Sequence, residues 1–267
     1  MCFNRENVQG NQQPQELSLP EIVKIARSLK PLPQLLLSGG EPFLLSDIAS
    51  LVTAFYRFSA TRQVSIPTNG TLPERILHAV QDILEQCPDV YLNINLSLDG
   101  IAEYHDASRG FPGCFDRVCE TYRLLDRVRR TEKRLTLNFL TVVKYQNAAH
   151  MNSFVRYVRD HFRPNYHSVG FVRGNVDDAE KDFDMEALRE ELNALYSRPY
   201  AIRDLPVFGR IAPAVASTLR ETLHACEQDS TRRRFHCLAG RKMVVLTADG
   251  KLMPCEPLWL EPDVRRG

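Results

Sequence analysis

The sequence lacks the features that would place it in several large classes of protein. None of its apolar runs approaches the roughly 20 residues that a membrane-spanning helix needs. Met1 is followed directly by the polar segment that begins at Cys2, without the apolar stretch of a signal peptide. The formal net charge is only +1, and the basic residues do not gather into one stripe that would bind nucleic acid. These absences predict a cytosolic protein with no membrane or nucleic-acid partner.

The cysteines also argue against one class, the disulfide-stabilised secreted domains. An odd count in a chain predicted to be cytosolic leaves buried thiols, metal ligands or a nucleophile. We interpret Cys87, Cys114 and Cys119 as buried structural thiols, because they match no ligand spacing, and Cys226 has no assigned role. The seven cysteines are Cys2, Cys87, Cys114, Cys119, Cys226, Cys237 and Cys255.

What the sequence does contain is a regular alternation of predicted strands and helices. Its 267 residues, 43% of them hydrophobic, suffice for one large domain with a sizeable core. Apolar runs recur at roughly 30-residue intervals with amphipathic segments between them, which is typical of βα units in a parallel sheet or barrel. We predict strands at 34–37, 63–66, 90–98, 135–143 and 168–173, with helices at 18–29, 47–55, 73–86, 115–130 and 152–161.

Beyond Gly174 the pattern changes. Residues 176–184 are acidic and resemble a linker, and two amphipathic helices are predicted at 185–196 and 212–227. Residues 242–246 and 251–253 then predict a β-hairpin around the turn at Asp249-Gly250.

The predicted strand 90–98 has one apolar and one polar face. Val90, Leu92, Ile94, Leu96 and Leu98 alternate with polar residues, among them Asn93, Asn95 and Ser97. Strand geometry places the two sets on opposite faces. The polar set lines either a polar cavity or the wet face of an antiparallel strand.

The stretch around which the chain is organised is Leu35 to Pro42. An apolar strand stops at Ser38, and two glycines and a carboxylate follow, Gly39, Gly40 and Glu41. The glycines allow a positive φ or a close approach of the backbone to a ligand. Glu41 at the end of a strand suits a ligand ammonium group, although a tight turn with a solvated glutamate gives the same pattern.

Several motifs stand in a fixed order, and all except the one at Cys2 lie after a predicted strand or around the hairpin. The ordered set resembles the radical S-adenosylmethionine (SAM) enzymes that carry a SPASM or twitch-type C-terminal extension. The motifs are Cys2-Phe3-Asn4, Ser38-Gly39-Gly40-Glu41-Pro42, Thr68-Asn69-Gly70, Ser97-Leu98-Asp99-Gly100 with His105-Asp106 and Arg109-Gly110, and Cys237 and Cys255 around the hairpin.

The resemblance implies an α/β fold: a partial (β/α)6 TIM-like barrel that lacks its first strand, followed by a small α+β extension of helices and a β-hairpin. It implies a barrel core at 1–175, a linker with helices at 176–233, and the start of an auxiliary cluster domain at 234–267. It also implies two cofactors, a [4Fe-4S] cluster and SAM, and a possible auxiliary [4Fe-4S] cluster.

The same resemblance assigns roles to residues of the motifs. Glu41 matches the glutamate that binds the methionyl amine of SAM, and the Ser38-Gly39-Gly40 segment matches the loop that lets the backbone approach it. Ser97 matches a polar residue near the ribose or carboxylate, and Asn69 a residue that helps to hold the SAM loop. Arg109 matches an arginine that pairs with the SAM carboxylate, which suits guanidinium geometry. No catalytic residue is assigned.

The cysteines depart from the family pattern. Cys2 matches the third cysteine of the CxxxCxxC cluster loop, and the first two are missing, as is the strand before them. Cys237 and Cys255 match the first two cysteines of an auxiliary cluster, without the later cysteine-rich run. We therefore expect a chain truncated at both ends, one that does not hold the radical-generating cluster stably by itself.

Three functions stay open at this point. The first is a radical SAM enzyme of peptide or protein maturation, with a peptide or small-molecule substrate and a reductant such as flavodoxin or ferredoxin. The second is a SAM-binding or partner-binding protein without radical chemistry, because two cluster cysteines are absent. The third is a TIM-barrel enzyme with Glu41 or Asp99 as general base. For His105 and Asp106 we predict hydrogen bonds that order their loop.

Overall fold

The computed structural model describes residues 16–29, 31–172, 178–188, 192 and 238–255. The chain divides into two compact units. Among the described residues, the first unit holds 18–192, and the second holds 16–17 and 238–255.

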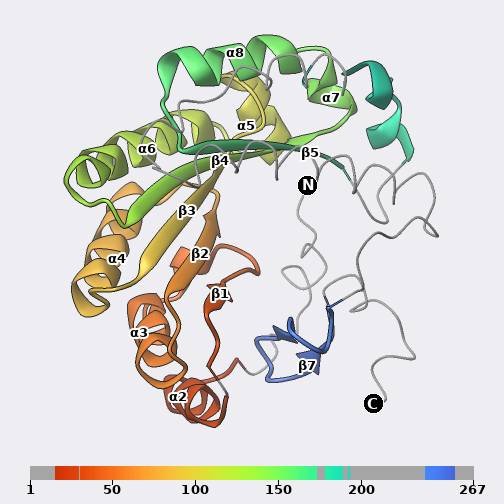
Figure 1. Ribbon diagram of the computed structural model, residues 1–267. Coiled ribbons are helices and arrows are strands. Elements are labelled where there is room, and N and C mark those ends of the chain that lie inside the picture. The colour runs from red at the N-terminus through yellow and green to blue at the C-terminus, as the bar shows by residue number, and fades with distance from the viewer. Residues whose placement is uncertain (1–15, 30, 173–177, 189–191, 193–237, 256–267) are drawn as a thin grey trace, which may run out of the picture. The chain divides into compact units, whose positions relative to one another are not determined.

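The first unit is built on a sheet of five parallel strands (Figure 1). Its strands neighbour one another in chain order, as expected when each βα unit adds one strand beside the last. The strands are β1 (Gln34–Leu36), β2 (Gln63–Thr68), β3 (Tyr91–Ser97), β4 (Leu135–Val143) and β5 (Tyr166–Phe171). All five lie within or overlap the predicted strand ranges, with β5 beginning two residues early.

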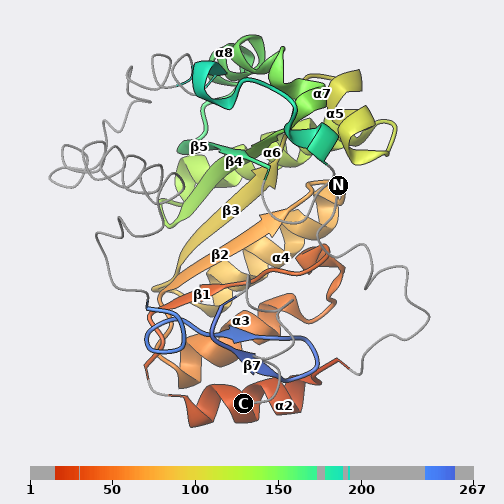
Figure 2. The same ribbon diagram turned by 90° about the vertical axis from the view of Figure 1, so that its right-hand side faces the viewer.

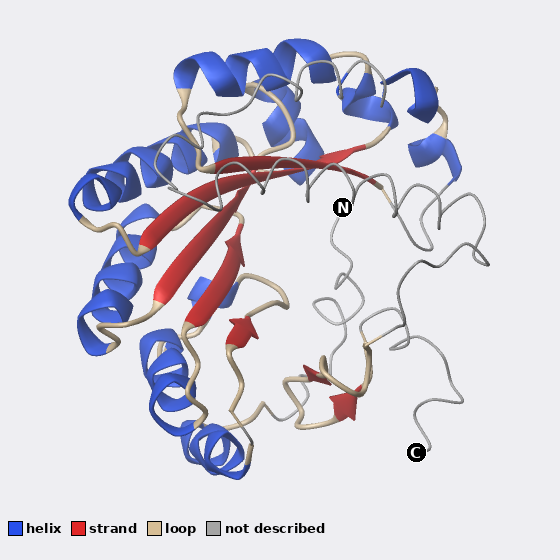
Figure 3. Cartoon of the chain, viewed as in Figure 1, coloured by secondary structure: helices blue, strands red, loops and turns tan. Residues whose placement is uncertain are grey.

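Helices cover one face of this sheet (Figures 1 and 3). The helix α3 packs against α2 and α4, and α6 packs against α4, β3 and β4. The helices are α2 (Leu19–Ser28), α3 (Ile48–Phe58), α4 (Pro73–Gln86), α5 (Glu103–Arg109), α6 (Cys114–Thr131), α7 (Tyr145–Ala148) and α8 (Met151–His161), with 3-10 turns η1 (Pro42–Leu44) and η2 (Asp178–Lys181).

Two of these helices, α5 and α7, are absent from the sequence-based prediction. Their seven and four residues are too few to show a helical period. The predicted helix 185–196 is helical at 185–188 and 192, whereas the predicted helix 212–227 lies outside the described residues.

The core of the first unit lies between the sheet and the helices. Leu92, Ile94 and Leu96 of β3 are fully buried there, and so are Leu137 and Phe139 of β4. The strand alternation predicted for 90–98 is thus confirmed, with the apolar residues facing the helices. The opposite face of the sheet carries the polar residues.

The second unit contains a small antiparallel hairpin, as predicted. Its strands are β6 (Val245–Leu246) and β7 (Leu252–Met253). Gly250 has a φ of +82°, which a glycine adopts without strain, and Leu17 donates its backbone N–H to the Ala248 carbonyl over 2.8 Å. The chain is therefore an α/β protein with five parallel strands and a hairpin, and the closure of the sheet as a partial barrel stays a prediction.

None of the described helices has the length and apolar character needed to cross a membrane. The cytosolic location stays a prediction from the sequence.

Candidate functional site

The residues predicted to bind SAM lie where the parallel strands end. Glu41 follows β1, Asn69 follows β2, Ser97 ends β3, and Arg109 ends the helix after β3. Because the strands are parallel, their carboxyl ends share one edge of the sheet (Figure 2). The sequence motifs predict that these residues share the carboxyl edge of the sheet.

The loop after β1 has an open conformation. Ser38, Gly39 and Gly40 are exposed, and a Cβ built on either glycine would meet no atom within 4 Å. Gly39 has a φ of +128°, which excludes most other residues. The glycines therefore leave the backbone of this loop accessible to a ligand.

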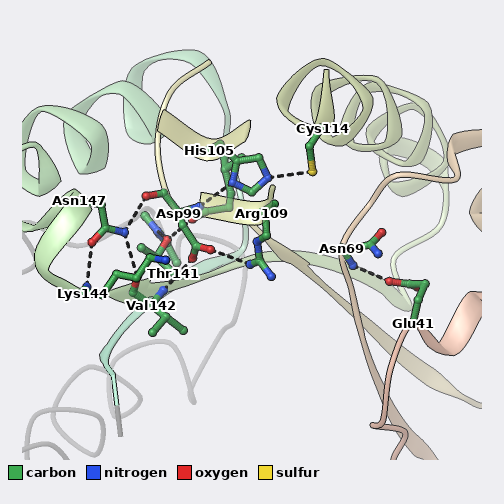
Figure 4. Close-up of polar contacts among 12 residues, drawn as sticks. Glu41, Asn69, Asp99, His105, Arg109, Cys114, Thr141, Val142, Lys144 and Asn147 are labelled. Carbon is green, nitrogen blue, oxygen red and sulfur yellow. Dashed lines mark hydrogen bonds and ion pairs between the residues drawn. The ribbon is translucent and has the colours of Figure 1, made fainter. Parts of the chain in front are cut away.

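Glu41 is fixed by the end of the neighbouring strand (Figure 4). Its carboxylate accepts hydrogen bonds from the Thr68 hydroxyl at 2.7 Å, the Asn69 backbone N–H at 2.7 Å and the Phe43 backbone N–H at 3.2 Å. Burial raises the pKa of Glu41, and these hydrogen bonds and the charge of Arg109 oppose the rise. The carboxylate is thus held in place and lies within electrostatic reach of the arginine.

Asn69 contributes to this arrangement through its backbone. Its side-chain oxygen accepts hydrogen bonds from the Thr71 backbone N–H at 2.9 Å and hydroxyl at 2.7 Å, so it orders the turn after β2. Thr68 also belongs to the site, although the sequence motif assigns it no role of its own. Its hydroxyl donates to Glu41 and accepts from the Gly70 N–H.

Arg109 is paired with a carboxylate of the same loop region. Its Nη2 lies 2.8 Å from Oδ2 of Asp99, whose side chain is 6% exposed. The Nε atom of Arg109 is buried and has no hydrogen-bond partner in the described part of the chain. The guanidinium therefore combines one fixed contact with a side chain that is still 25% exposed (Figure 4).

His105 and Asp106 order the segment around α5, as predicted. The Nδ1 atom of His105 accepts the Asp99 backbone N–H at 3.1 Å, and its Nε2 lies 3.4 Å from Sγ of Cys114. Burial lowers the pKa of His105 to about 4, so the ring is neutral near pH 7. Asp106 accepts the backbone N–H groups of Gly113 and Phe115 at the start of α6.

A row of half-buried polar side chains crosses the sheet on the face opposite the helices. Asn138 donates to Asn95 at 3.0 Å, Asn95 donates to Ser65 at 2.7 Å, and Thr136 donates to Asn93 at 2.6 Å. These bonds satisfy polar groups that a plain apolar core would not carry. The row lies on the same face of β3 as Ser97, deeper in the sheet.

Only one of the three predicted metal ligands lies among the described residues. Cys2 and Cys237 lie outside them, and Cys255 is a half-buried free thiol of the second unit. Cys87, Cys114 and Cys119 are buried and free, as predicted, and burial raises their pKa values, that of Cys119 to about 11. No group of three or more His, Cys, Asp or Glu side chains suited to a metal ion occurs among the residues that the structure describes.

Comparison with known proteins identifies the family. The model of the Radical SAM superfamily matches residues 1–158, more than half of the chain. The chain therefore belongs to the radical SAM superfamily of enzymes, and this membership implies a [4Fe-4S] cluster and SAM as cofactors.

Among individual relatives, the AdoMet-dependent heme synthase of Methanosarcina barkeri (strain Fusaro / DSM 804) is 26% identical over 231 residues, which cover 84% of this chain and 62% of the relative. The Fe-coproporphyrin III synthase of the same organism is 40% identical over 85 residues, or 32% of this chain and 19% of the relative. The solved structure of native anSMEcpe with bound AdoMet and Cp18Cys peptide has a TM-score of 0.49 at 20% identity and covers 66% of this chain and 49% of its own. The chain spans less than two thirds of the length of each of these proteins.

Proposed function

We propose that this chain binds SAM at the carboxyl edge of its sheet, as part of an enzyme that cleaves SAM to initiate radical chemistry. The observation that carries the proposal is the presence of two opposite charges at that edge, a fixed carboxylate at Glu41 and a guanidinium at Arg109. The methionyl end of SAM carries one ammonium and one carboxylate. A fixed carboxylate and a guanidinium with a donor to spare are complementary to those two groups.

The described residues fit SAM better than they fit the cluster. The open Ser38-Gly39-Gly40 loop admits a ligand beside Glu41, and the Arg109 side chain is 25% exposed, so its N–H groups outside the Asp99 ion pair can meet a ligand carboxylate. For the cluster, the described residues offer no set of three thiolates. We therefore assign SAM to Glu41, Arg109, Ser97, Asn69 and the glycine loop.

When bound, a [4Fe-4S] cluster would supply the electron for reductive cleavage of SAM to methionine and a 5′-deoxyadenosyl radical, the species that abstracts hydrogen from a substrate. The residues of this chain orient SAM for that step. Glu41 accepts hydrogen bonds from the ammonium, and Arg109 binds the carboxylate, so that the sulfonium is held in one position. We propose Cys2 as a cluster ligand and Cys237 and Cys255 as ligands of an auxiliary cluster.

The remaining parts of the proposal come from the sequence. We propose a barrel core at 1–175, a linker with helices at 176–233 and an auxiliary domain that begins at 234, and a reductant such as flavodoxin or ferredoxin. For the substrate we propose a peptide or protein, on the basis of the cysteines around the hairpin. A tetrapyrrole is the second candidate, because the relative that covers 84% of this chain is named as a heme synthase.

The first test is SAM binding by the 267-residue chain, measured by isothermal titration calorimetry. We expect saturable binding that is weakened by Glu41→Gln and by Arg109→Gln. The matched control is Glu103→Gln, an exposed carboxylate on α5 that lies outside the proposed site. Loss of affinity in the control equal to that in the two site variants would contradict the proposal.

The second test concerns the reaction. The chain is reconstituted anaerobically with iron and sulfide, given SAM and a reductant, and assayed for 5′-deoxyadenosine with and without peptide or tetrapyrrole substrates. Production of 5′-deoxyadenosine supports the radical reaction and contradicts the expectation that this chain alone holds no stable cluster. SAM binding without 5′-deoxyadenosine favours the alternative, a SAM-binding protein without radical chemistry.

A further inference from the structure

Arg109 is held at the end of a short helix by an ion pair. It is the last residue of α5, and Gly110 ends that helix with a φ of +64°. The guanidinium makes its ion pair through Nη2, 2.8 Å from Oδ2 of Asp99, while Nε stays buried without a partner in the described part of the chain. An arginine side chain has several rotatable bonds, so this contact selects one of many conformations.

Asp99 is itself immobilised from several directions (Figure 4). Its Oδ1 accepts the Val142 backbone N–H at 2.9 Å, its backbone N–H donates to Nδ1 of His105 at 3.1 Å, and its carbonyl accepts from Nδ2 of Asn147 at 2.9 Å. The residue is 4% exposed. These contacts come from β4, α5 and α7, so the Asp99 carboxylate is a rigid support.

We propose that Asp99 is a positioning residue, which holds the Arg109 guanidinium in the conformation that receives the carboxylate of SAM. The inference rests on the proposed function, because it assumes that Arg109 binds that carboxylate. A guanidinium that is already oriented loses less conformational freedom when the ligand binds. It can also bridge two carboxylates through different N–H groups, since it carries five donors.

The experiment compares two ligands that differ in one group. SAM carries the carboxylate, and decarboxylated SAM keeps the sulfonium, the ammonium and the nucleoside without it. Dissociation constants of both are measured by calorimetry for the 267-residue chain and for Asp99→Asn, which has nearly the same shape but no charge. Glu103→Gln is the control, because it removes the same charge from an exposed position of α5.

We expect Asp99→Asn to weaken SAM binding about tenfold and to leave the affinity for decarboxylated SAM within about twofold. In an Arg109→Gln background, Asp99→Asn should cause no further loss, because its effect passes through the arginine. Equal loss of both ligands would indicate a merely structural role and overturn the inference.

The two levels of the proposal fail in different ways. SAM affinity that falls in Arg109→Gln but is unchanged or higher in Asp99→Asn overturns the positioning role alone. An unsubstituted chain that does not bind SAM overturns the proposed function, and the positioning role with it.

Discussion

At the scale of single residues, the site depends on charges held in low-dielectric surroundings. Glu41 receives three hydrogen bonds, yet burial still raises its pKa above the ordinary 4.5. An ammonium group placed beside it would restore the balance, because an opposite charge favours the ionised form. This is the behaviour that the proposed contact between Glu41 and the ammonium of SAM requires.

This balance predicts a pH dependence of SAM affinity. Below the raised pKa of Glu41 the folded protein carries a proton that must leave before the carboxylate accepts from the ammonium. Affinity should therefore fall on acidification at a higher pH than an ordinary glutamate would give. Calorimetry between pH 7.5 and pH 5 tests this. In Glu41→Gln the affinity should be lower, and its fall on acidification should be absent. An identical pH profile in both proteins would contradict the prediction.

Two buried histidines predict a pH dependence of stability. Burial lowers the pKa values of His105 and His167 from 6.5 to about 4. The unfolded chain therefore binds these protons more readily than the folded one, so stability is lost as the pH falls from about 6.5 toward 4. Each group contributes up to about 1.4 kcal/mol per pH unit in that window.

The measurement is urea unfolding at several pH values between 7 and 4.5. His167→Gln should have a shallower slope than the unsubstituted protein. His78→Gln removes an exposed histidine of α4 and should leave the slope unchanged. Equal slopes in all three proteins would contradict the prediction.

Some of these residue contacts could be predicted from the sequence, and others could not. The motif around Glu41 predicted a carboxylate at a strand end, because strand, diglycine and acid are contiguous. The partners of Glu41 come from Thr68 and the backbone of Asn69, 27 and 28 residues away, and no local pattern encodes them. The Asp99–Arg109 pair was missed for a similar reason, since it requires the turn and the whole of α5 between the two residues.

At the scale of elements, hydrophobic periodicity predicts the long helices and strands that bury only one face. The strands β3 and β4 and the helices α4 and α6 bury one face, so their apolar residues recur with the period of the element. The short helix α5 has no such signature. Its Asp106 side chain contacts the start of α6, and its His105 side chain contacts Asp99. The sequence predicted only that His105 and Asp106 make hydrogen bonds that order a loop.

This connection gives a prediction for α5 and α6. Asp106 accepts two backbone N–H groups at the start of α6, and these bonds lower its pKa. Asp106→Ala leaves both donors unsatisfied and should lower the free energy of unfolding by about 1 kcal/mol, as the loss of a helix cap does. Asp106→Asn keeps an acceptor oxygen and should lose less. Urea denaturation compares the two with Glu103→Ala, and a loss in that exposed control as large as in Asp106→Ala would argue against the capping role.

At the scale of the whole molecule, burial sorts the four cysteines that the structure describes into two chemical classes. Cys87, Cys114 and Cys119 lie in the core of the first unit, and their raised pKa values keep them as thiols. Thiolates bind iron–sulfur clusters, so these three positions are unsuited to that task. Cys255, in the second unit, is half-buried.

This sorting predicts the outcome of alkylation of the folded chain. With iodoacetamide near pH 7.5, mass spectrometry should find Cys255 modified and Cys87, Cys114 and Cys119 protected until urea unfolds the protein, because access and thiolate fraction are both low in the core. Serine substitution of Cys119 should likewise leave unchanged whatever iron the chain takes up on anaerobic reconstitution, whereas Cys2→Ser should lower it. Iron content that follows Cys119 rather than Cys2 would mean that the cluster ligands come from the core, and would refute the assignment of Cys2.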